Sequence, residues 1–361
     1  MKKMKMMALV MAGALLLGGC GGNGKNGGGN EKEDSNGKVA CIFGVGGLGD
    51  QAFNDLTNEG LKKAEEELNV EYDYAEPTQV SDFELFLRDM ATTGEYSVII
   101  SLGFDSMDAL AKVSQEFPEQ QFALIDSTLE EENVASYEGK EQEGAFLVGA
   151  LAGLMLSQPD KYDVGATNAA GFIGAMDTPL INKFYAGYAA GIKYVNPEAE
   201  VLRNYVAGDN PFGDTATAKE IAISQNNQGA GIVFHAAGGS GLGMLEAAGE
   251  YDFLAIGCNT NQNGTDPDHV AASMLKRVDT AAYEIVKAAC IDENLGVNTT
   301  VTLGLADEGI DYTLEGSNIT VDQEDIDALE QIRKMVVDGE IVVPAAEEEI
   351  EQFLQKNKWS N

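Results

Sequence analysis

Basic residues and histidines are scarce in this sequence. Its 361 residues include 23 Lys and Arg against 59 Asp and Glu, and the formal net charge at pH 7 is −36. A chain this acidic is repelled by phosphate backbones, so we expect no nucleic-acid partner. With only two histidines, His235 and His269, and no Cys-x-x-Cys pair, the sequence offers no structural zinc site. We therefore expect no metal and no cofactor.

Long apolar runs are also scarce, and the one that stands out lies at the N-terminus. Three lysines precede an apolar stretch over residues 6–17, which is shorter than the roughly 20 residues that span a bilayer as a helix. This pattern is typical of a signal peptide. It ends in Leu-Gly-Gly-Cys, with the cysteine at position 20, which resembles the bacterial lipobox. We predict a lipoprotein signal peptide over residues 1–19.

Cys20 is the predicted lipidation site and would become the first residue of the mature chain. Residues 20–37 contain no large apolar residue and are rich in glycine and asparagine, so we expect a flexible tether. These predictions place the protein at the cell membrane, on its extracytoplasmic face, attached through the lipid anchor only. The alternative is a secretory signal that happens to end near a cysteine.

The remaining cysteines do not suggest a disulfide framework. Once Cys20 is assigned to lipid, Cys41, Cys258 and Cys290 are left. Their number is odd, and each lies in an apolar or strand-like context. We predict buried thiols.

From residue 38 onward, apolar runs alternate with helical periodicities. Residues 39–45 (VACIFGV) form an apolar run bounded by glycines, which is typical of a strand buried on both faces of a parallel sheet. Residues 53–68 then place apolar side chains at helical spacing. Further strands are expected at 70–74, 96–102 and 122–125, and further helices from residue 81 and over 106–116. This alternation predicts an α/β domain with a parallel sheet.

The alternation restarts after residue 144, which predicts a second lobe of the same type. Its expected helices are 144–156, 180–195, 215–224 and 241–249, and its expected strands are 171–175, 201–206, 231–235 and 253–258. Beyond residue 270 we expect a helix over 278–290, short strands at 301–305 and 341–343, and helices over 322–338 and 346–356, with an unassigned segment at 312–314.

Two Rossmann-like lobes joined by a hinge are the predicted architecture. The first lobe is expected to comprise residues 38–127 and 277–303, and the second residues 128–276 and 304–361, so the chain crosses between them several times. Ligands of open α/β sheets bind outside the carboxyl ends of the strands. With two lobes facing each other, those ends should line one shared cleft.

Candidate ligand-binding residues follow the predicted strands. After the first strand, a glycine-rich turn leads to Asp50, Phe53 and Asn54, where glycine allows close backbone approach and an aromatic ring can stack on a flat ligand. Asp126 follows the fourth strand; a carboxylate there is costly to bury without a donor. It can also be read simply as a turn or helix-cap acid.

The second lobe supplies a matching set after its own strands. The candidates are Phe184, Gly238, Gly239, Asn259 and Lys276. Phe184 can also be interpreted as a core residue of its helix with no contact to a ligand. The glycine-rich turn after the first strand has neither the spacing of a dinucleotide-binding turn nor that of a P-loop, so a nucleotide ligand is disfavoured.

A series of short motifs runs in order from about residue 38 to 310, most of the mature chain. They are Gly-Asp-Gln-Ala-Phe-Asn at 49–54, Asp-Ser at 126–127, residues 143–149, Gly-Phe-Ile-Gly at 171–174, Phe-Tyr-Ala-Gly-Tyr at 184–188 and Lys-Arg-Val-Asp at 276–279. Together these motifs resemble the basic membrane protein family of substrate-binding lipoproteins, which includes purine nucleoside receptors, and residues 49–54 resemble that family's signature.

This resemblance implies the two-lobed type I periplasmic-binding-protein fold and an ABC importer with separate permease and ATPase subunits. Phe53 and Phe184 would sandwich a purine, and Asn54 and Asp126 would read the edge of the base. Gly238 and Gly239 would allow close backbone approach. Asn259 and Lys276 would lie on the ribose side, with Asp50 nearby. We expect a monomer, because the two lobes must move freely against a permease.

The sequence departs from the family pattern after the last strand of the second lobe. Family members commonly carry an aspartate-rich Val-Asp-x-Asp-Gln turn there, whereas residues 258–262 read Cys-Asn-Thr-Asn-Gln. Amides at Asn259 and Asn261 bind ribose hydroxyls less firmly than carboxylates do. A free base, a deoxynucleoside or a modified sugar therefore remain admissible ligands.

Three other functions remain open from the sequence, and one of them is a surface interaction or regulatory lipoprotein. The same fold can bind a sugar or another small signalling ligand, because cleft aromatics suit sugars as well as purines. An enzyme such as a nucleoside hydrolase would use Asp50 and Asp126 as a carboxylate pair. We expect no enzymatic activity, because the site has no nearby histidine and no aspartate cluster.

Overall fold

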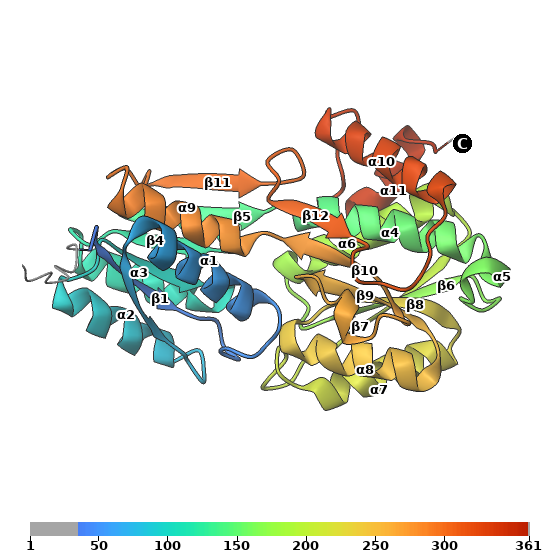
Figure 1. Ribbon diagram of the computed structural model, residues 1–361, viewed down its shortest axis with the longest axis horizontal. Coiled ribbons are helices and arrows are strands. Elements are labelled where there is room, and N and C mark those ends of the chain that lie inside the picture. The colour runs from blue at the N-terminus through green and yellow to red at the C-terminus, as the bar shows by residue number, and fades with distance from the viewer. Residues whose placement is uncertain (1–34, 360–361) are drawn as a thin grey trace, which may run out of the picture. The chain divides into compact units, whose positions relative to one another are not determined.

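Two six-stranded sheets organise the part of the chain that the structure describes, residues 35–359 of a computed structural model (Figure 1). The first sheet has the strand order β11-β5-β4-β3-β1-β2, and all its neighbouring strands are parallel. Its strands are β1 (Lys38–Ile42), β2 (Glu71–Ala75), β3 (Val98–Leu102), β4 (Phe122–Ile125), β5 (Val134–Gly139) and β11 (Thr299–Leu303). We call this sheet and its helices the first lobe.

Helices cover both faces of the first sheet. On one face α1 (Phe53–Leu68) and α9 (Val278–Cys290) pack side by side. On the other face α2 (Asp82–Thr93) and α3 (Met107–Glu116), the latter preceded by a 3-10 turn η1 (Phe104–Ser106), enclose a second apolar cluster. This coverage explains why β1, β3 and β4 are continuous apolar runs, since neither face of the sheet meets water.

The second sheet has the order β12-β10-β9-β8-β6-β7, and only β12 runs antiparallel to its neighbour. Its strands are β6 (Ala169–Gly174), β7 (Glu200–Tyr205), β8 (Ala230–Ala236), β9 (Leu254–Asn259), β10 (Val270–Lys276) and β12 (Ile310–Thr313). Its helices are α4 (Glu141–Leu156), α5 (Pro159–Tyr162), α6 (Pro179–Val195), α7 (Thr215–Asn227), α8 (Gly241–Tyr251), α10 (Gln323–Val337) and α11 (Glu347–Lys356), with 3-10 turns η2 (Gly238–Ser240) and η3 (Asn263–Thr265). These elements form the second lobe.

The predicted α/β alternation is confirmed, with a few local differences. The sequence analysis missed β5 and β10, whose segments VASYEG and VAASMLK are rich in small or polar residues. It also missed the single-turn helix α5. The strand expected at residues 341–343 is wrong: Ile341 and Val343 are buried and Val342 is exposed, which imitates a strand, but this segment joins neither sheet.

The chain crosses between the lobes at three places. β5 pairs with β4 in the first sheet although it lies beyond residue 127, where the first boundary was expected, so the first crossing follows Gly139. The other crossings lie between β10 and α9 and between β11 and β12. The Lys140 amide donates to the Leu303 carbonyl at 2.8 Å, and the Arg277 amide donates to the Gly309 carbonyl at 2.9 Å. These bonds tie the three crossings into one hinge segment.

Predictions for the N-terminal region lie almost wholly outside the described residues. They concern the signal peptide over 1–19, Cys20 and most of the tether over 20–37. Asn36, at the end of the expected tether, is bonded to the first lobe: its backbone N–H donates to Asn69 and its side-chain amide donates to the Leu68 carbonyl. Over residues 35–359 no helix is long and apolar enough to cross a membrane.

The three cysteines of the described region are free thiols, as predicted. Cys41 and Cys258 are buried, and burial raises the pKa of each thiol. Cys290 is only half-buried, because it ends α9 at the edge of the lobe. Within residues 35–359 no group of three or more acidic, histidine or cysteine side chains is placed to hold a metal ion.

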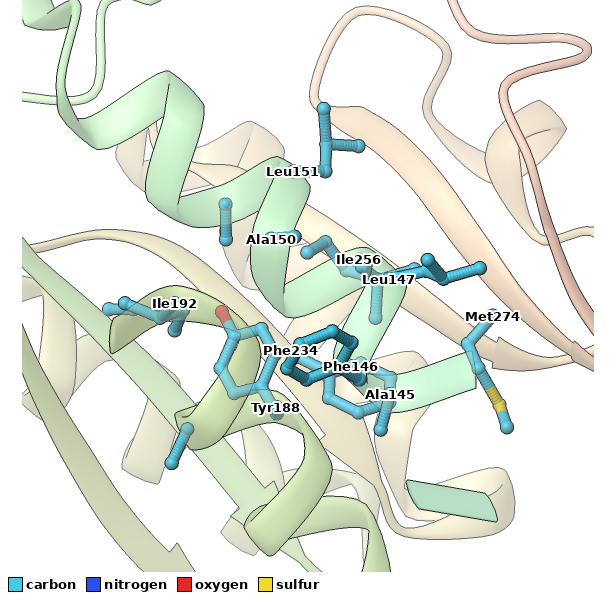
Figure 2. Close-up of a cluster of buried hydrophobic side chains, with 14 of the residues drawn as sticks. Ala145, Phe146, Leu147, Ala150, Leu151, Tyr188, Ile192, Phe234, Ile256 and Met274 are labelled. Carbon is cyan, nitrogen blue, oxygen red and sulfur yellow. The ribbon is translucent and has the colours of Figure 1, made fainter. Parts of the chain in front are cut away.

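The core of the second lobe is built on the close packing of α4 against α6 (Figure 2). Phe146, Tyr188 and Phe234 belong to this core, where the rings of Tyr188 and Phe234 are tilted against each other with centroids 5.1 Å apart. The two helices approach so closely that a Cβ at Gly191 would collide with the Phe146 carbonyl and the Ala150 amide. Glycine is therefore required at this crossing for steric reasons.

We expect Gly191→Ala to lower the free energy of unfolding by about 1–3 kcal/mol, as overpacking of a tight core does. The added methyl group meets helix backbone, which cannot turn aside as a side chain can. The measurement is denaturant unfolding of the purified protein. Gly264→Ala is the control, because no atom lies within 4 Å of a Cβ at that position. Equal stability of both variants would contradict the packing argument.

Candidate functional site

A cavity of about 260 Å³ lies between the two lobes, where the carboxyl ends of their strands meet. In the first sheet β1 has β2 on one side and β3 on the other, and in the second sheet β6 lies between β7 and β8. The strand order reverses at these points, and such switch points are where open α/β sheets bind ligands. The volume is just below the range of about 300–1,000 Å³ typical of drug-sized ligands, which suits a compact solute.

The structure brings all nine predicted ligand-binding residues to the wall of this one cavity. They come from six separate strand ends or helix starts, and are Asp50, Phe53, Asn54, Asp126, Phe184, Gly238, Gly239, Asn259 and Lys276. Their roles toward a ligand differ, however, because the protein already uses some of their polar atoms.

Two aromatic rings from opposite lobes flank the ammonium group of Lys276. Phe53 begins α1 of the first lobe, and Phe184 lies in the second turn of α6. Lys276 Nζ is 5.8 Å from the ring centroid of Phe53 and 5.7 Å from that of Phe184. We call the pair of rings Phe53 and Phe184 the aromatic slot. Stacking on a flat ring would use the full face of each phenyl group.

Lys276 belongs to a buried cluster of charges that reaches the hinge. Its ammonium group pairs with Asp126 and lies 2.8 Å from Glu141 Oε1. Glu141 is completely buried at the start of α4 and also lies 3.6 Å from Lys183 Nζ. The sequence analysis missed Glu141, and no sequence pattern marks it, because its partner is 135 positions away in β10.

Two opposing effects set the pKa values in this cluster: burial disfavours the charged forms, and the ion pairs favour them. Burial raises the pKa of Asp126 to about 6, although Lys276 acts to lower it. Burial alone would lower the pKa of Lys276, but the Asp126 and Glu141 carboxylates raise it above its ordinary value. Lys276 therefore stays charged. Its positive charge stands beside the aromatic slot.

Asn54 presents a donor to the cavity. Its side-chain oxygen accepts the Gly44 N–H at 2.8 Å. Because a backbone N–H can only donate, the atom facing Gly44 must be the oxygen. The NH₂ group of Asn54 donates to no protein acceptor within the described residues. It remains free to donate to a ligand.

The carboxylate of Asp50 is engaged by the protein. It accepts backbone N–H groups of Ala52 at 2.9 Å, Asn54 at 2.8 Å and Asp55 at 3.1 Å. It thus caps the first turn of α1, whose free N–H groups need acceptors. Burial raises the pKa of Asp50, and these backbone donors oppose the rise. The structure gives Asp50 a role in holding Phe53 and Asn54 in place.

Asp126 and Asn259 lie at the ends of strands in the two lobes. Asp126 directly follows β4, and Asn259 is the last residue of β9. Both have left-handed backbone, with φ of 76° and 70°. Aspartate and asparagine tolerate this conformation better than other non-glycine residues. It turns the chain at the end of the strand, where both residues line the cavity.

Asn261, the second amide in place of a family acid, does not line the cavity. Its NH₂ group donates to the Glu315 carbonyl at 3.1 Å, and its oxygen accepts the Asn263 N–H at 3.1 Å. The neighbouring Gln262 NH₂ group reaches across the cleft to the Gln51 carbonyl at 3.3 Å. Of the two amide substitutions, only Asn259 changes the wall of the cavity.

Gly238 and Gly239 lie where the two lobes come close. A Cβ on Gly239 would be 3.7 Å from Cα of Asp50, which belongs to the opposite lobe. Gly238 has φ of 53° and faces Phe212. The absence of side chains here leaves room between the lobes.

Several cavity residues were missed by the sequence analysis. Phe104 and Asp105 follow β3 in the first lobe, and Phe212 follows β7 in the second. The rings of Phe104 and Phe212 are 6.5 Å apart at their centroids. The signal was available, since the sequence predicted a strand over 96–102, and residues after any parallel strand of the sheet face the same edge.

Fold and cavity together define the class of proteins that enclose one small solute between two hinged α/β lobes. A family model described as ABC transporter substrate-binding protein PnrA-like matches residues 38–347, and the chain belongs to this family. The resemblance found in the sequence is thereby confirmed. Membership implies a small-molecule ligand and permease and ATPase partners on other chains.

Curated relatives and solved structures agree with this family. The chain is 27% identical to the ABC transporter nucleoside-binding protein BmpA of Lactococcus lactis, over 94% of this chain and 97% of that protein. It is 33% identical to an uncharacterized lipoprotein of Pyrococcus abyssi, over 85% of this chain and 76% of that protein. A solute-binding protein of an ABC transporter system from Aeropyrum pernix K1 superposes with a TM-score of 0.78 at 28% identity, over 90% of this chain and all of that one.

Proposed function

We propose that this protein is the extracytoplasmic, lipid-anchored binding subunit of an ABC importer, and that it binds a purine nucleoside. The lipid anchor is Cys20, and the binding subunit is a monomer with no nucleic-acid partner. Relatives named as lipoproteins support the anchor. The relative from Lactococcus lactis, named as a nucleoside-binding protein, supports the ligand.

The observation that carries the choice of a purine is the aromatic slot. Phe53 and Phe184 come from opposite lobes, so a flat ring between them would hold the lobes together. The NH₂ group of Asn54 and the ammonium group of Lys276 are donors beside the slot. A purine offers ring nitrogens as acceptors at its edge, and its two faces would stack on the phenyl rings.

Binding without catalysis is part of the same proposal. The carboxylates once considered as a hydrolytic pair are both engaged: Asp50 caps α1, and Asp126 pairs with Lys276. Neither histidine lines the cavity. A general base must be free to take a proton, and these groups are not. Incubation with inosine should release no hypoxanthine; release of the free base would contradict this part of the proposal.

Calorimetric titration of the purified protein tests the ligand. The panel comprises adenosine, guanosine, inosine, the purine bases, uridine, cytidine, ribose and galactose. We expect binding of at least one purine nucleoside and none of ribose or galactose. A ligand at 100 times its dissociation constant should also stabilise the fold by about 2.7 kcal/mol, which thermal unfolding would detect. Binding of sugars alone would overturn the proposed ligand class.

A further inference from the structure

Three carboxylates that line the cavity differ in how the protein satisfies them. Asp50 accepts three backbone N–H groups, and Asp126 pairs with Lys276. Asp105 receives no hydrogen bond and forms no ion pair within residues 35–359, although it is half-buried. A partly desolvated carboxylate without a donor is costly. Asp105 is therefore the cavity acid that is free to accept donors from a ligand.

Asp105 stands apart from the charged cluster around the aromatic slot. Burial raises the pKa of the Asp105 carboxyl, and no charged neighbour contributes to the shift. By contrast, Lys276 and Glu141 both act on the pKa of Asp126. Asp105 and the aromatic slot thus line the same cavity without a resolved electrostatic interaction between Asp105 and Lys276.

The wall of the cavity next to Asp105 is apolar. The residue follows β3, at the switch point of the first sheet. Its neighbour Phe104 contacts Phe212, and Phe212 in turn faces Gly238, which has no side chain. Asp105 is thus a free acid beside apolar lining residues.

We propose that Asp105 binds the vicinal hydroxyl pair of the ligand's ribose, an inference that rests on the proposed nucleoside ligand. The two oxygens of a carboxylate accept two neighbouring O–H groups at once, and such charge-assisted bonds are stronger than bonds to an amide. Asn259 supplies only an amide to the cavity. Asp105, from the opposite lobe, supplies the carboxylate that the second lobe lacks.

The test compares ribonucleosides with their 2′-deoxy and 3′-deoxy forms by calorimetry, on the full chain and on Asp105→Asn. We expect the unmodified protein to prefer the ribonucleoside by about 10- to 100-fold, the effect of losing a hydrogen bond to a charged group. In Asp105→Asn this preference should fall to a few-fold, while affinity for the free purine base stays the same. Asp108→Asn, an exposed acid three positions later on α3, is the matched control and should keep the preference.

The possible results distinguish failure of the proposed function from failure of the assignment of Asp105 to the ribose. If no purine nucleoside binds the unmodified protein, the proposed function fails. If nucleosides bind but the ribose preference is absent, or survives intact in Asp105→Asn, the assignment of Asp105 is overturned. If Asp105→Asn weakens binding of the free base as much as binding of the nucleoside, Asp105 contacts the base. This result would also overturn the assignment of Asp105 to the ribose. Asp105 has no protein partner, so the variant should unfold at the same temperature as the parent or higher.

Discussion

Removing both rings of the aromatic slot, in the double variant Phe53→Ala/Phe184→Ala, is expected to weaken purine nucleoside binding by about 30- to 20,000-fold. Stacking of one base on one aromatic side chain contributes about 1–3 kcal/mol by alanine substitution, and each 1.4 kcal/mol is a factor of ten in affinity. The two rings lie on different lobes, so each single variant removes one face of the slot. Calorimetric titration of both single variants and the double variant gives the contribution of each ring.

The control for the slot is Tyr251→Ala, which removes an exposed aromatic side chain at the end of α8, away from the cavity. It should leave affinity unchanged. Phe53→Leu and Phe184→Leu keep apolar bulk without a ring and should bind with intermediate affinity. An unchanged dissociation constant for the double variant would mean that the ligand does not stack between Phe53 and Phe184.

Replacing Lys276 by methionine is expected to lower the free energy of unfolding at pH 7 by about 3–5 kcal/mol, the cost of breaking a buried ion pair from one side. The variant leaves Asp126 without its ion-pair partner and leaves the fully buried Glu141 with Lys183, 3.6 Å away, as its one remaining partner among the described residues. Because Glu141 begins α4 beside the first crossing, the damage falls on the hinge as well as on the cavity. Denaturant unfolding of the purified variant measures the loss.

The same variant should recover part of its stability as the pH falls from 7 to 5. The pKa of Asp126 is already raised to about 6 by burial with Lys276 present, and removing Lys276 raises it further. An acid whose pKa is higher in the folded state than in the unfolded state binds more protons when folded, so protonation stabilises the fold. The deficit relative to the parent should therefore shrink at lower pH.

Lys334→Met is the matched control for this pH series. Lys334 pairs with Asp338 on the surface of α10, where its side chain is 73% exposed, and an exposed pair contributes little to stability. We expect no measurable change in the free energy of unfolding at either pH value. A deficit in Lys276→Met that stays constant between pH 7 and 5 would show that the buried acids are not its cause.

Most of the fold was predictable because its signals are local. Strands buried on both faces read as apolar runs, and α1 and α9 were predicted with the bounds that they have. β5 and β10 were missed because small and polar residues fill them. The strand expected at residues 341–343 was wrong because alternating burial also occurs where a single segment lies across a core without pairing.

By itself the sequence determined the two α/β lobes, the family, and which side chains follow which strands. That was enough to gather nine residues at one cavity, since the carboxyl ends of parallel strands share an edge. Only the tertiary structure decided what those side chains are free to do. It engages Asp50 in capping α1, places Glu141 against Lys276, turns Asn261 away from the cavity and leaves Asp105 without a partner among residues 35–359. The physical reason is that a polar atom's availability depends on its partners, and in a folded chain many of those partners lie far away in sequence.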